Sequence, residues 1–520
     1  MTVLALPQKR ALRIAVVAGC IFVLILLSHV FYAPITPTGI KGQIRSTASR
    51  LRARPQYDPK KLHMLIPATS TNHHLCQLMT SAVVLGYPAP ILLNWGGVED
   101  ADDYVQHLQK VEVVLSYVES LPEEQQDELV FMMDGFDAWF QLPADIMIKR
   151  YYDVLDFAHQ QNVEMYGADG VERHDIRDTV LFGPDKLCWP EDPNRAACWV
   201  VPESWMPEQG FGPDTDHGIH DHNRARWLNS GTILGPAREV REVFAATLAK
   251  IHDHHTTDSD QFYFSNVWAD QSYARRLVGL EYDRSRGINV SETEAKLLPP
   301  PPPPPPPPPE VPEGEEPPEP PPPPPPGLEI PELKEGKSYE LHIGLDFSSD
   351  IWQTIAYYED YMTWVQHNYS SRYTLSDAAT INPSHHFTMP ADLVGLSPIM
   401  ALARNGDRGN VNYEQLPEAM RSWATVPLAT NTVSKTIAPV LHFTGKKSYR
   451  ELWWPRNWFW PYQEEIFKWL RDRGVVREGE WRDPLAGGWT YSKKNRKGWV
   501  NWEDGLCGAY EERLRGKFVG

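Results

Sequence analysis

Two aspartates that follow a short apolar segment are the residues of this chain best suited to chemistry. Residues 129–133 are all apolar, and Asp134, Gly135, Phe136 and Asp137 follow directly. An apolar segment of this length between charged residues is typical of a strand inside a parallel sheet, and open α/β sheets bind ligands at the carboxyl ends of such strands. The spacing lets both carboxylates approach one cation. Oxygen ligands favour Mn²⁺ or Mg²⁺, which can bridge a diphosphate and offset its charge as it leaves.

A histidine in the second half of the chain could supply a third ligand. The apolar residues 440–443 are interrupted by His442, and Gly445, Lys446 and Lys447 follow. Mn²⁺ tolerates a nitrogen ligand, and glycine beside two lysines suits a diphosphate. Each segment alone has an ordinary explanation, because Asp-Gly after a strand is common turn chemistry and a lone histidine is usually structural. Together they indicate a metal and diphosphate site.

Short apolar segments and longer amphipathic ones alternate around these residues. Residues 63–67 and 90–95 are mostly apolar, and a helix-like stretch that ends near residue 85 separates them. A helical pattern at 100–118 then precedes the apolar segment at 129–133. This alternation predicts β-α-β units and an α/β domain.

Two further segments contain residues suited to a ligand. Residues 226–235 predict a strand, and its residues Asn229, Ser230 and Gly231 let the backbone approach a ligand closely. Residues 258–261 read Asp-Ser-Asp-Gln and precede an amphipathic helix. Both segments support the same interpretation.

In the order and residues of these motifs, the region 62–460 resembles the glycosyltransferase domain of procollagen lysyl hydroxylases and related collagen glycosyltransferases. The resemblance implies an α/β fold of the GT-A type, a Rossmann-like domain that binds a nucleotide-sugar. The hydroxylase domain of that family is expected to be absent from this sequence. The metal ligands implied by the resemblance are Asp134, Asp137 and His442. The implied donor contacts are Trp95, Lys110, Phe136, Asn229, Ser230 and Gly231.

The resemblance also assigns the acceptor side of the site. The family's acidic residue before an aromatic-proline pair matches Asp185, and its later Leu-Asp pair matches Asp346. The segment that begins at His442 also resembles the His-x-x-Gly signature of glycogenin-like transferases, which implies that Gly445 approaches the diphosphate. Lys446, or the lysine after it, would then assist the leaving group. A direct displacement would use Asp185 as general base, whereas a retaining mechanism needs only the stabilised leaving group, and both mechanisms stay open.

A proline-rich tract divides the predicted domain. Eleven consecutive prolines occupy 299–309 and seven more occupy 320–326. Because Asp134 precedes the tract and His442 follows it, one domain at 61–520 is expected to contain both, with the tract as a surface loop at about 297–335. The segment 299–326 could bind a proline-recognising partner, although a plain linker is the simpler interpretation.

The amino-terminal residues predict a membrane anchor. Residues 14–33 contain no formal charge and are long enough to span a bilayer, and three basic residues precede them. A cleaved signal peptide would have a shorter apolar core. The positive-inside rule then predicts a cytosolic tail at 1–13, a stem at 34–60 and a lumenal domain, so we expect a single-pass type II protein of the Golgi or ER membrane.

The cysteine content fits an oxidising lumen, and the charge argues against nucleic acid as a partner. The formal net charge is −18 and no basic stripe is interleaved with aromatic residues, so nucleic acid is not expected as a partner. Outside the anchor, Cys76, Cys188, Cys198 and Cys507 allow three pairings, of which Cys188 with Cys198 is preferred; four free buried thiols are the alternative.

The sequence thus predicts a metal-dependent transferase that moves a sugar from a nucleotide-sugar, with UDP-sugar expected, to a glycan or glycoprotein acceptor. One alternative is a catalytically silent GT-A-like domain that acts as a Golgi scaffold or binds glycans. Another is a metal-dependent hydrolase centred on His217, His220 and Asp221, although a solvated acidic loop explains these residues more simply. The tryptophans after residue 450 could stack on sugars, but residues of this kind more often fill a core.

Overall fold

The structure is a computed structural model, and it describes residues 58–97, 103–253, 255, 257, 259–288, 327–367, 387–398, 417–474, 477–478, 481–494 and 497–515. These residues belong to the larger of two compact units, residues 57–520. The predicted cytosolic tail, the membrane anchor, nearly all of the stem and the prolines at 299–326 lie outside the described residues. Among the described residues, no helix is both long and apolar enough to cross a membrane.

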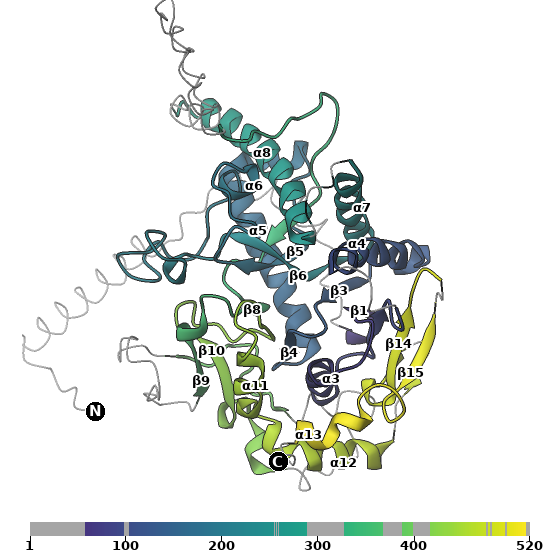
Figure 1. Cartoon of the computed structure of the whole chain (residues 1–520). Coiled ribbons are helices and arrows are strands. Elements are labelled where there is room, and N and C mark those ends of the chain that lie inside the picture. Colours follow the sequence, from purple (N-terminus) through teal and green to yellow (C-terminus); the bar gives the residue numbers. More distant parts are fainter. Residues whose placement is uncertain are drawn as a thin grey trace, which may run out of the picture. The chain divides into compact units, whose positions relative to one another are not determined.

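The fold is mixed α/β around one large, mostly parallel sheet (Figure 1). Its strands follow the order β15-β14-β2-β1-β3-β6-β5-β7, and only β6 and β15 run antiparallel to their neighbours. The bounds of these strands are β1 (Leu62–Pro67), β2 (Ile91–Leu93), β3 (Leu129–Met133), β5 (Val180–Asp185), β6 (Trp227–Pro236), β7 (Ile343–Leu345), β14 (Gly487–Tyr491) and β15 (Gly498–Asn501).

The strand predicted at 129–133 is confirmed as β3, and its uniformly apolar sequence follows from burial on both faces. Phe131 and Met133 pack into one hydrophobic cluster, while Val130 and Met132 pack into another on the opposite face. Its neighbours differ from the expected parallel ones, because β3 pairs parallel with β1 but antiparallel with β6. An apolar strand must be buried on both faces of the sheet, but this requirement does not decide whether the neighbouring strand runs parallel or antiparallel.

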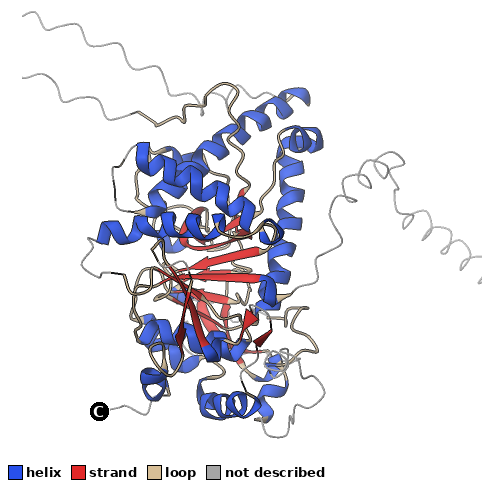
Figure 2. Ribbon diagram, turned by 90° about the vertical axis from the view of Figure 1, so that its right-hand side faces the viewer, coloured by secondary structure: helices blue, strands red, loops and turns tan. Residues whose placement is uncertain are grey.

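Helices cover both faces of the sheet (Figure 2). One face packs against α3 (His73–Leu85) and α5 (Ala144–Arg173). The other packs against α4 (Asp103–Glu119), α7 (Ala237–Asp253) and α8 (Asp260–Ser285). The helix predicted at 100–118 is confirmed as α4, and the one expected after 258–261 is confirmed as α8. The shorter helices are α6 (Ala196–Trp199), α11 (Tyr449–Trp453), α12 (Gln463–Arg473) and α13 (Glu511–Leu514).

A small three-stranded sheet joins distant parts of the chain. Its order is β4-β11-β8, with β4 (Ala138–Phe140), β11 (Val440–His442) and β8 (Trp352–Thr354). In the antiparallel pairing of β11 with β4, His442 lies opposite Ala138, the residue directly after Asp137. The remaining strands form two pairs, β9 (Met362–Gln366) with β10 (Pro427–Asn431) and β12 (Arg477–Glu478) with β13 (Trp481–Arg482).

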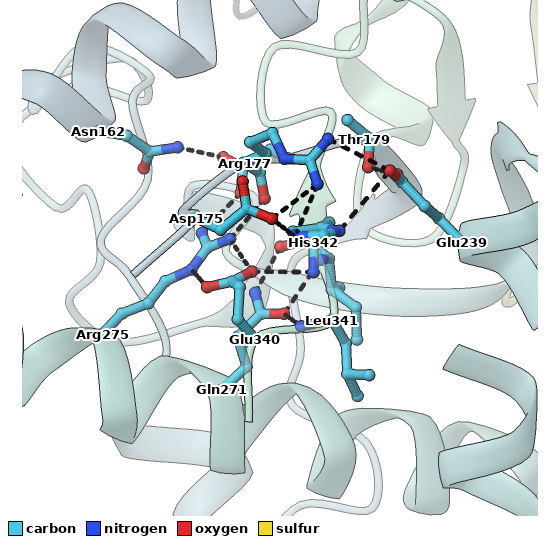
Figure 3. A network of polar contacts seen from close by, with 12 residues as sticks. Asn162, Asp175, Arg177, Thr179, Glu239, Gln271, Arg275, Glu340, Leu341 and His342 are labelled. Carbon is cyan, nitrogen blue, oxygen red and sulfur yellow. Dashed lines mark hydrogen bonds and ion pairs between the residues drawn. The ribbon is translucent and has the colours of Figure 1, made fainter. Parts of the chain in front are cut away.

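A buried ionic network fixes the amino ends of β5 and β7 (Figure 3). From α8, the Arg275 guanidinium donates to Asp178 at 2.6 Å and to Glu340 at 2.7 Å. Asp178 precedes β5, and Glu340 precedes β7 on the far side of the proline-rich tract. Since β5 and β7 pair in parallel, the segments before and after the tract share one sheet.

The carboxyl-terminal segment belongs to the same fold. β14 pairs with β2, and a disulfide joins Cys507 to Cys76 in α3. A second disulfide joins Cys188 to Cys198, which confirms the preferred pairing. The core interpretation of the late tryptophans is confirmed for three of them, since the described structure buries Trp453, Trp454 and Trp458 in the hydrophobic core.

Candidate functional site

A cavity of about 1050 Å³ lies at the carboxyl ends of the parallel strands. The residues that follow β1, β2, β3 and β14 line it, together with Asp185 at the end of β5. This is where an open α/β sheet is expected to bind its ligand. Most of the residues predicted for the site line this cavity: Trp95, Lys110, Asp134, Phe136, Asp137, Asp185, Asn229, Ser230, Gly231, His442 and Gly445.

Asp134 is at the centre of the polar contacts in the cavity. Its Oδ1 lies 3.2 Å from Lys110 Nζ, and its Oδ2 lies 4.0 Å from His442 Nε2. Lys110 is buried and also binds Asp260 at 2.6 Å. Burial acts to lower the pKa of Lys110, but the two carboxylates outweigh burial and raise it. Lys110 therefore stays charged and holds Asp134 beside the first turn of α8.

Gly231 makes the close approach of Asp134 and His442 possible. A Cβ at this position would lie 2.4 Å from His442 Cε1 and 2.6 Å from Asp134 Oδ2. Both distances are far inside van der Waals contact, so a larger residue would push the two side chains apart. The peptide N–H of Asp134 also donates to the Gly231 carbonyl at 2.9 Å.

His442 has the properties of a neutral metal ligand. Its side chain is almost fully buried, and burial lowers its pKa to about 4 although Asp134 and Asp137 oppose the shift. The ring is therefore neutral near pH 7, which is the form that coordinates a cation. Its Nδ1 is buried and has no hydrogen-bond partner within the described part of the chain, while Nε2 faces the Asp134 carboxylate.

Asp137 is occupied by cations of the protein itself. Lys447 Nζ lies 2.5 Å from one carboxylate oxygen, and an Arg450 nitrogen lies 2.7 Å from the other. No group of three His, Cys, Asp or Glu side chains is arranged to hold a metal ion in the described ranges. Asp134 and His442 fit a shared ion, whereas Asp137 fits only if it exchanges its two ion pairs.

Asp185 is a buried carboxylate in the wall of the cavity. Asn229 Nδ2 donates to it at 3.2 Å, and Asn229 Oδ1 accepts the Gly231 N–H at 2.9 Å. Burial raises the pKa of Asp185 to about 6, although hydrogen bonds from Asn229, the Lys186 backbone and Gln261 act in the opposite direction. A carboxylate with this pKa can accept a proton near neutral pH. The exposed indole of Trp189 lines the cavity on the same side.

Two predicted residues are not brought to the cavity. Asp346 is 1% exposed, and its carboxylate accepts the backbone N–H groups of Asp350, Ile351 and Trp352 at 2.8–3.0 Å. It therefore organises the turn before β8 instead of facing a ligand. Lys446 is exposed and does not line the cavity, whereas the next residue, Lys447, does.

Sequence reasoning missed several residues of the cavity wall. The Asp-Ser-Asp-Gln motif predicts a segment suited to a ligand but gives no role to its third residue, Asp260. Asp258 of that motif lies outside the described residues. Ser492, Lys493 and Lys494 also line the cavity, and no local pattern marks them.

The loop with His217, His220 and Asp221 does not contribute to the cavity lining. The His220 ring packs at a tilt against Tyr357 with ring centroids 5.3 Å apart, and its Nε2 lies 3.8 Å from Glu191. The described part of this loop contains no three-ligand group. The geometry gives the hydrolase hypothesis no support.

No protein-family model matches the chain, and no curated protein is significantly similar to it.

Proposed function

We propose that this protein is a metal-dependent glycosyltransferase of the GT-A type that moves a sugar from a nucleotide-sugar, a UDP-sugar in particular, to a glycan or glycoprotein acceptor. One observation carries the proposal. The β4–β11 pairing brings His442 to Asp134 at the ligand-binding edge of a mostly parallel sheet, beside the buried carboxylate of Asp185. The anchor at 14–33 would place the domain in the lumen of the Golgi or ER as a type II membrane protein.

In this proposal Asp134 and His442 would hold Mn²⁺ or Mg²⁺, and Asp137 would join them once it gives up its ion pairs with Lys447 and Arg450. The ion would neutralise charge on the departing diphosphate. Lys447, which already lines the cavity, is then available to the diphosphate. The absence of a side chain at Gly445 would let the backbone approach the diphosphate closely. Trp95 and Phe136 provide aromatic surface on which the nucleotide base could pack.

Asp185 is the proposed base for the acceptor hydroxyl. Its burial keeps its pKa near the pH at which it must work, and Asn229 holds its orientation. The site is compatible with inversion or retention at the transferred sugar. An inverting reaction would use Asp185 as the base, whereas a retaining reaction would need only the residues that stabilise the departing diphosphate.

The experiment uses the full-length protein in detergent. UDP- and GDP-sugars are supplied with and without Mn²⁺, and nucleotide release is measured. We expect release from one donor with Mn²⁺ and a loss of about 100-fold in Asp134→Ala, since a metal contributes several kcal/mol to such reactions. Asp472→Ala, which removes an exposed carboxylate of α12, is the matched control. The proposal fails if no donor is bound or if Asp134→Ala behaves like the control.

One observation favours the alternative of a silent GT-A-like domain, because two cations already neutralise Asp137. A silent domain would bind a nucleotide or glycan without Mn²⁺-dependent release. The same measurement therefore separates the two candidates.

A further inference from the structure

The tip of the carboxyl-terminal hairpin forms part of the cavity wall. β14 pairs in parallel with β2, with Tyr491 opposite Leu93, so both strands end at the same edge of the sheet. The Asn94 N–H donates to the Tyr491 carbonyl at 2.8 Å, one residue before Trp95. Ser492, Lys493 and Lys494 follow β14 and line the cavity on the side of Trp95.

The hairpin is fixed to α4, the helix that carries Lys110. The Tyr491 hydroxyl donates to the Ser116 carbonyl at 2.9 Å, and Lys493 forms an ion pair with Glu112. Farther from the tip, the Arg482 guanidinium lies 4.3 Å from the Trp489 ring centre and 4.4 Å from that of Trp499. The tip therefore has a defined position relative to the cavity.

Lys494 differs from the other lysines of the cavity. Lys110 is paired with Asp134 and Asp260, Lys447 with Asp137, and Lys493 with Glu112. Lys494 forms no ion pair or hydrogen bond within the described part of the chain, and its side chain is exposed. Of the described lysines that line the cavity, it is the one whose three donors are available to a ligand.

The surface beside Lys494 suits a planar heterocycle. Trp95 presents a half-buried indole, on which a base can stack. Gly96 and Gly97 follow it and also line the cavity, and a Cβ on Gly96 would have no atom within 4 Å. The wall here is thus aromatic and open, with a lysine at its rim.

An ammonium group donates hydrogen bonds and accepts none. Uracil and guanine present a carbonyl oxygen on the edge away from the sugar, at O4 and O6, where cytosine and adenine present an amino group. A lysine at this edge would therefore bind uracil or guanine and disfavour cytosine and adenine.

We propose that Lys494 is a donor-specificity residue, which donates to the base carbonyl of the nucleotide and makes the cavity select uracil or guanine over cytosine and adenine. This inference rests on the proposed function. It gives the carboxyl-terminal hairpin a direct part in donor binding.

Calorimetry with the full-length protein in Mn²⁺ tests the inference, with UDP, GDP, CDP and ADP as probes. We expect UDP or GDP to bind more tightly than CDP and ADP. Lys494→Met, which keeps the side-chain length and removes the donors, should weaken the preferred nucleotide about tenfold and leave CDP and ADP nearly unchanged. Lys468→Met, on the exposed face of α12, is the matched control.

Each outcome decides between the two proposals. If the wild type binds none of the four nucleotides, the proposed function fails and the inference with it. If the wild type binds UDP but Lys494→Met matches the control, the inference alone fails. Equal weakening for all four nucleotides would show a phosphate contact and also overturn base selection, as would equal wild-type affinity for all four.

Discussion

Asp185 and Lys186 are consecutive buried residues of opposite charge, and burial moves both pKa values toward neutrality. The pKa of Asp185 rises to about 6, and that of Lys186 falls to about 7. The Lys186 ammonium lies 3.7 Å from the Phe211 ring centre and 4.1 Å from that of Tyr358, and it donates to the Tyr357 carbonyl at 2.9 Å. Burial thus places a proton acceptor with a pKa of about 6 in the wall of the cavity.

The proposed transfer activity should depend on pH through Asp185. Its pKa is raised, so the carboxyl is protonated below about pH 6 and ionised above it. A general base works only when ionised, so we expect kcat/KM for transfer to rise between pH 5 and pH 7. Asp185→Asn should abolish this rise of kcat/KM with pH and lower the transfer rate by about 100-fold or more, while nucleotide binding is kept. If the substituted protein retains the wild-type pH profile, Asp185 is not the base.

At the scale of elements, a buried charge network fixes the segment that leads into β7, in addition to the apolar packing of Ile343 and Leu345. Arg275 is 5% exposed and binds Asp178, Glu340 and the Arg177 carbonyl, which joins α8 to the segments before β5 and β7. Gln271 in the same helix accepts the N–H groups of Leu341 and Ile343 at 3.0 and 3.1 Å. These contacts hold the chain where it returns after the proline-rich tract.

Arg275→Leu should therefore destabilise the fold strongly. Removal of the guanidinium leaves two buried carboxylates without their cation, which typically costs about 3–5 kcal/mol. We expect a clear fall in melting temperature, measured by calorimetry or circular dichroism. Arg276→Leu changes the exposed neighbour in the same helix and should melt within a few degrees of the wild type. Equal melting of the two variants would mean that the network contributes little.

At the scale of the whole molecule, the carboxyl-terminal segment closes the fold. It supplies the β14–β15 edge of the main sheet, and the disulfide between Cys76 and Cys507 links residues 431 positions apart. A crosslink over so long a loop mainly restricts the unfolded chain.

The double variant Cys76→Ala/Cys507→Ala should be less stable than the wild type by about 2–5 kcal/mol, because its unfolded state gains conformational freedom. The measurement is urea unfolding followed by tryptophan fluorescence. Cys188→Ala/Cys198→Ala removes a crosslink over only 10 positions and serves as the comparison, for which a smaller loss is expected. A larger loss in the comparison would contradict the role assigned to the long-range disulfide.

The sequence by itself determined the local features of this protein. The strand at 129–133, the helix at 103–119 and the strand that ends in His442 were predictable because periodicity and apolar content depend on neighbouring residues. Asp134, Asp137 and His442 were predictable too, because polar residues that follow apolar strands meet at the ligand-binding edge of a sheet. Trp95, Lys110, Phe136 and Asp185 were predicted only from the family resemblance.

Only the tertiary structure decided which side chains face the cavity. Asp346 follows a strand of the same sheet, yet its carboxylate turns to three backbone N–H groups of the next turn. Lys447, rather than Lys446, points to Asp137 because the turn after β11 orients successive side chains differently. Lys494 reaches the cavity through the pairing of β14 with β2, between segments about four hundred residues apart. Pairings and side-chain directions of this kind arise from packing of the whole chain, which no local pattern records.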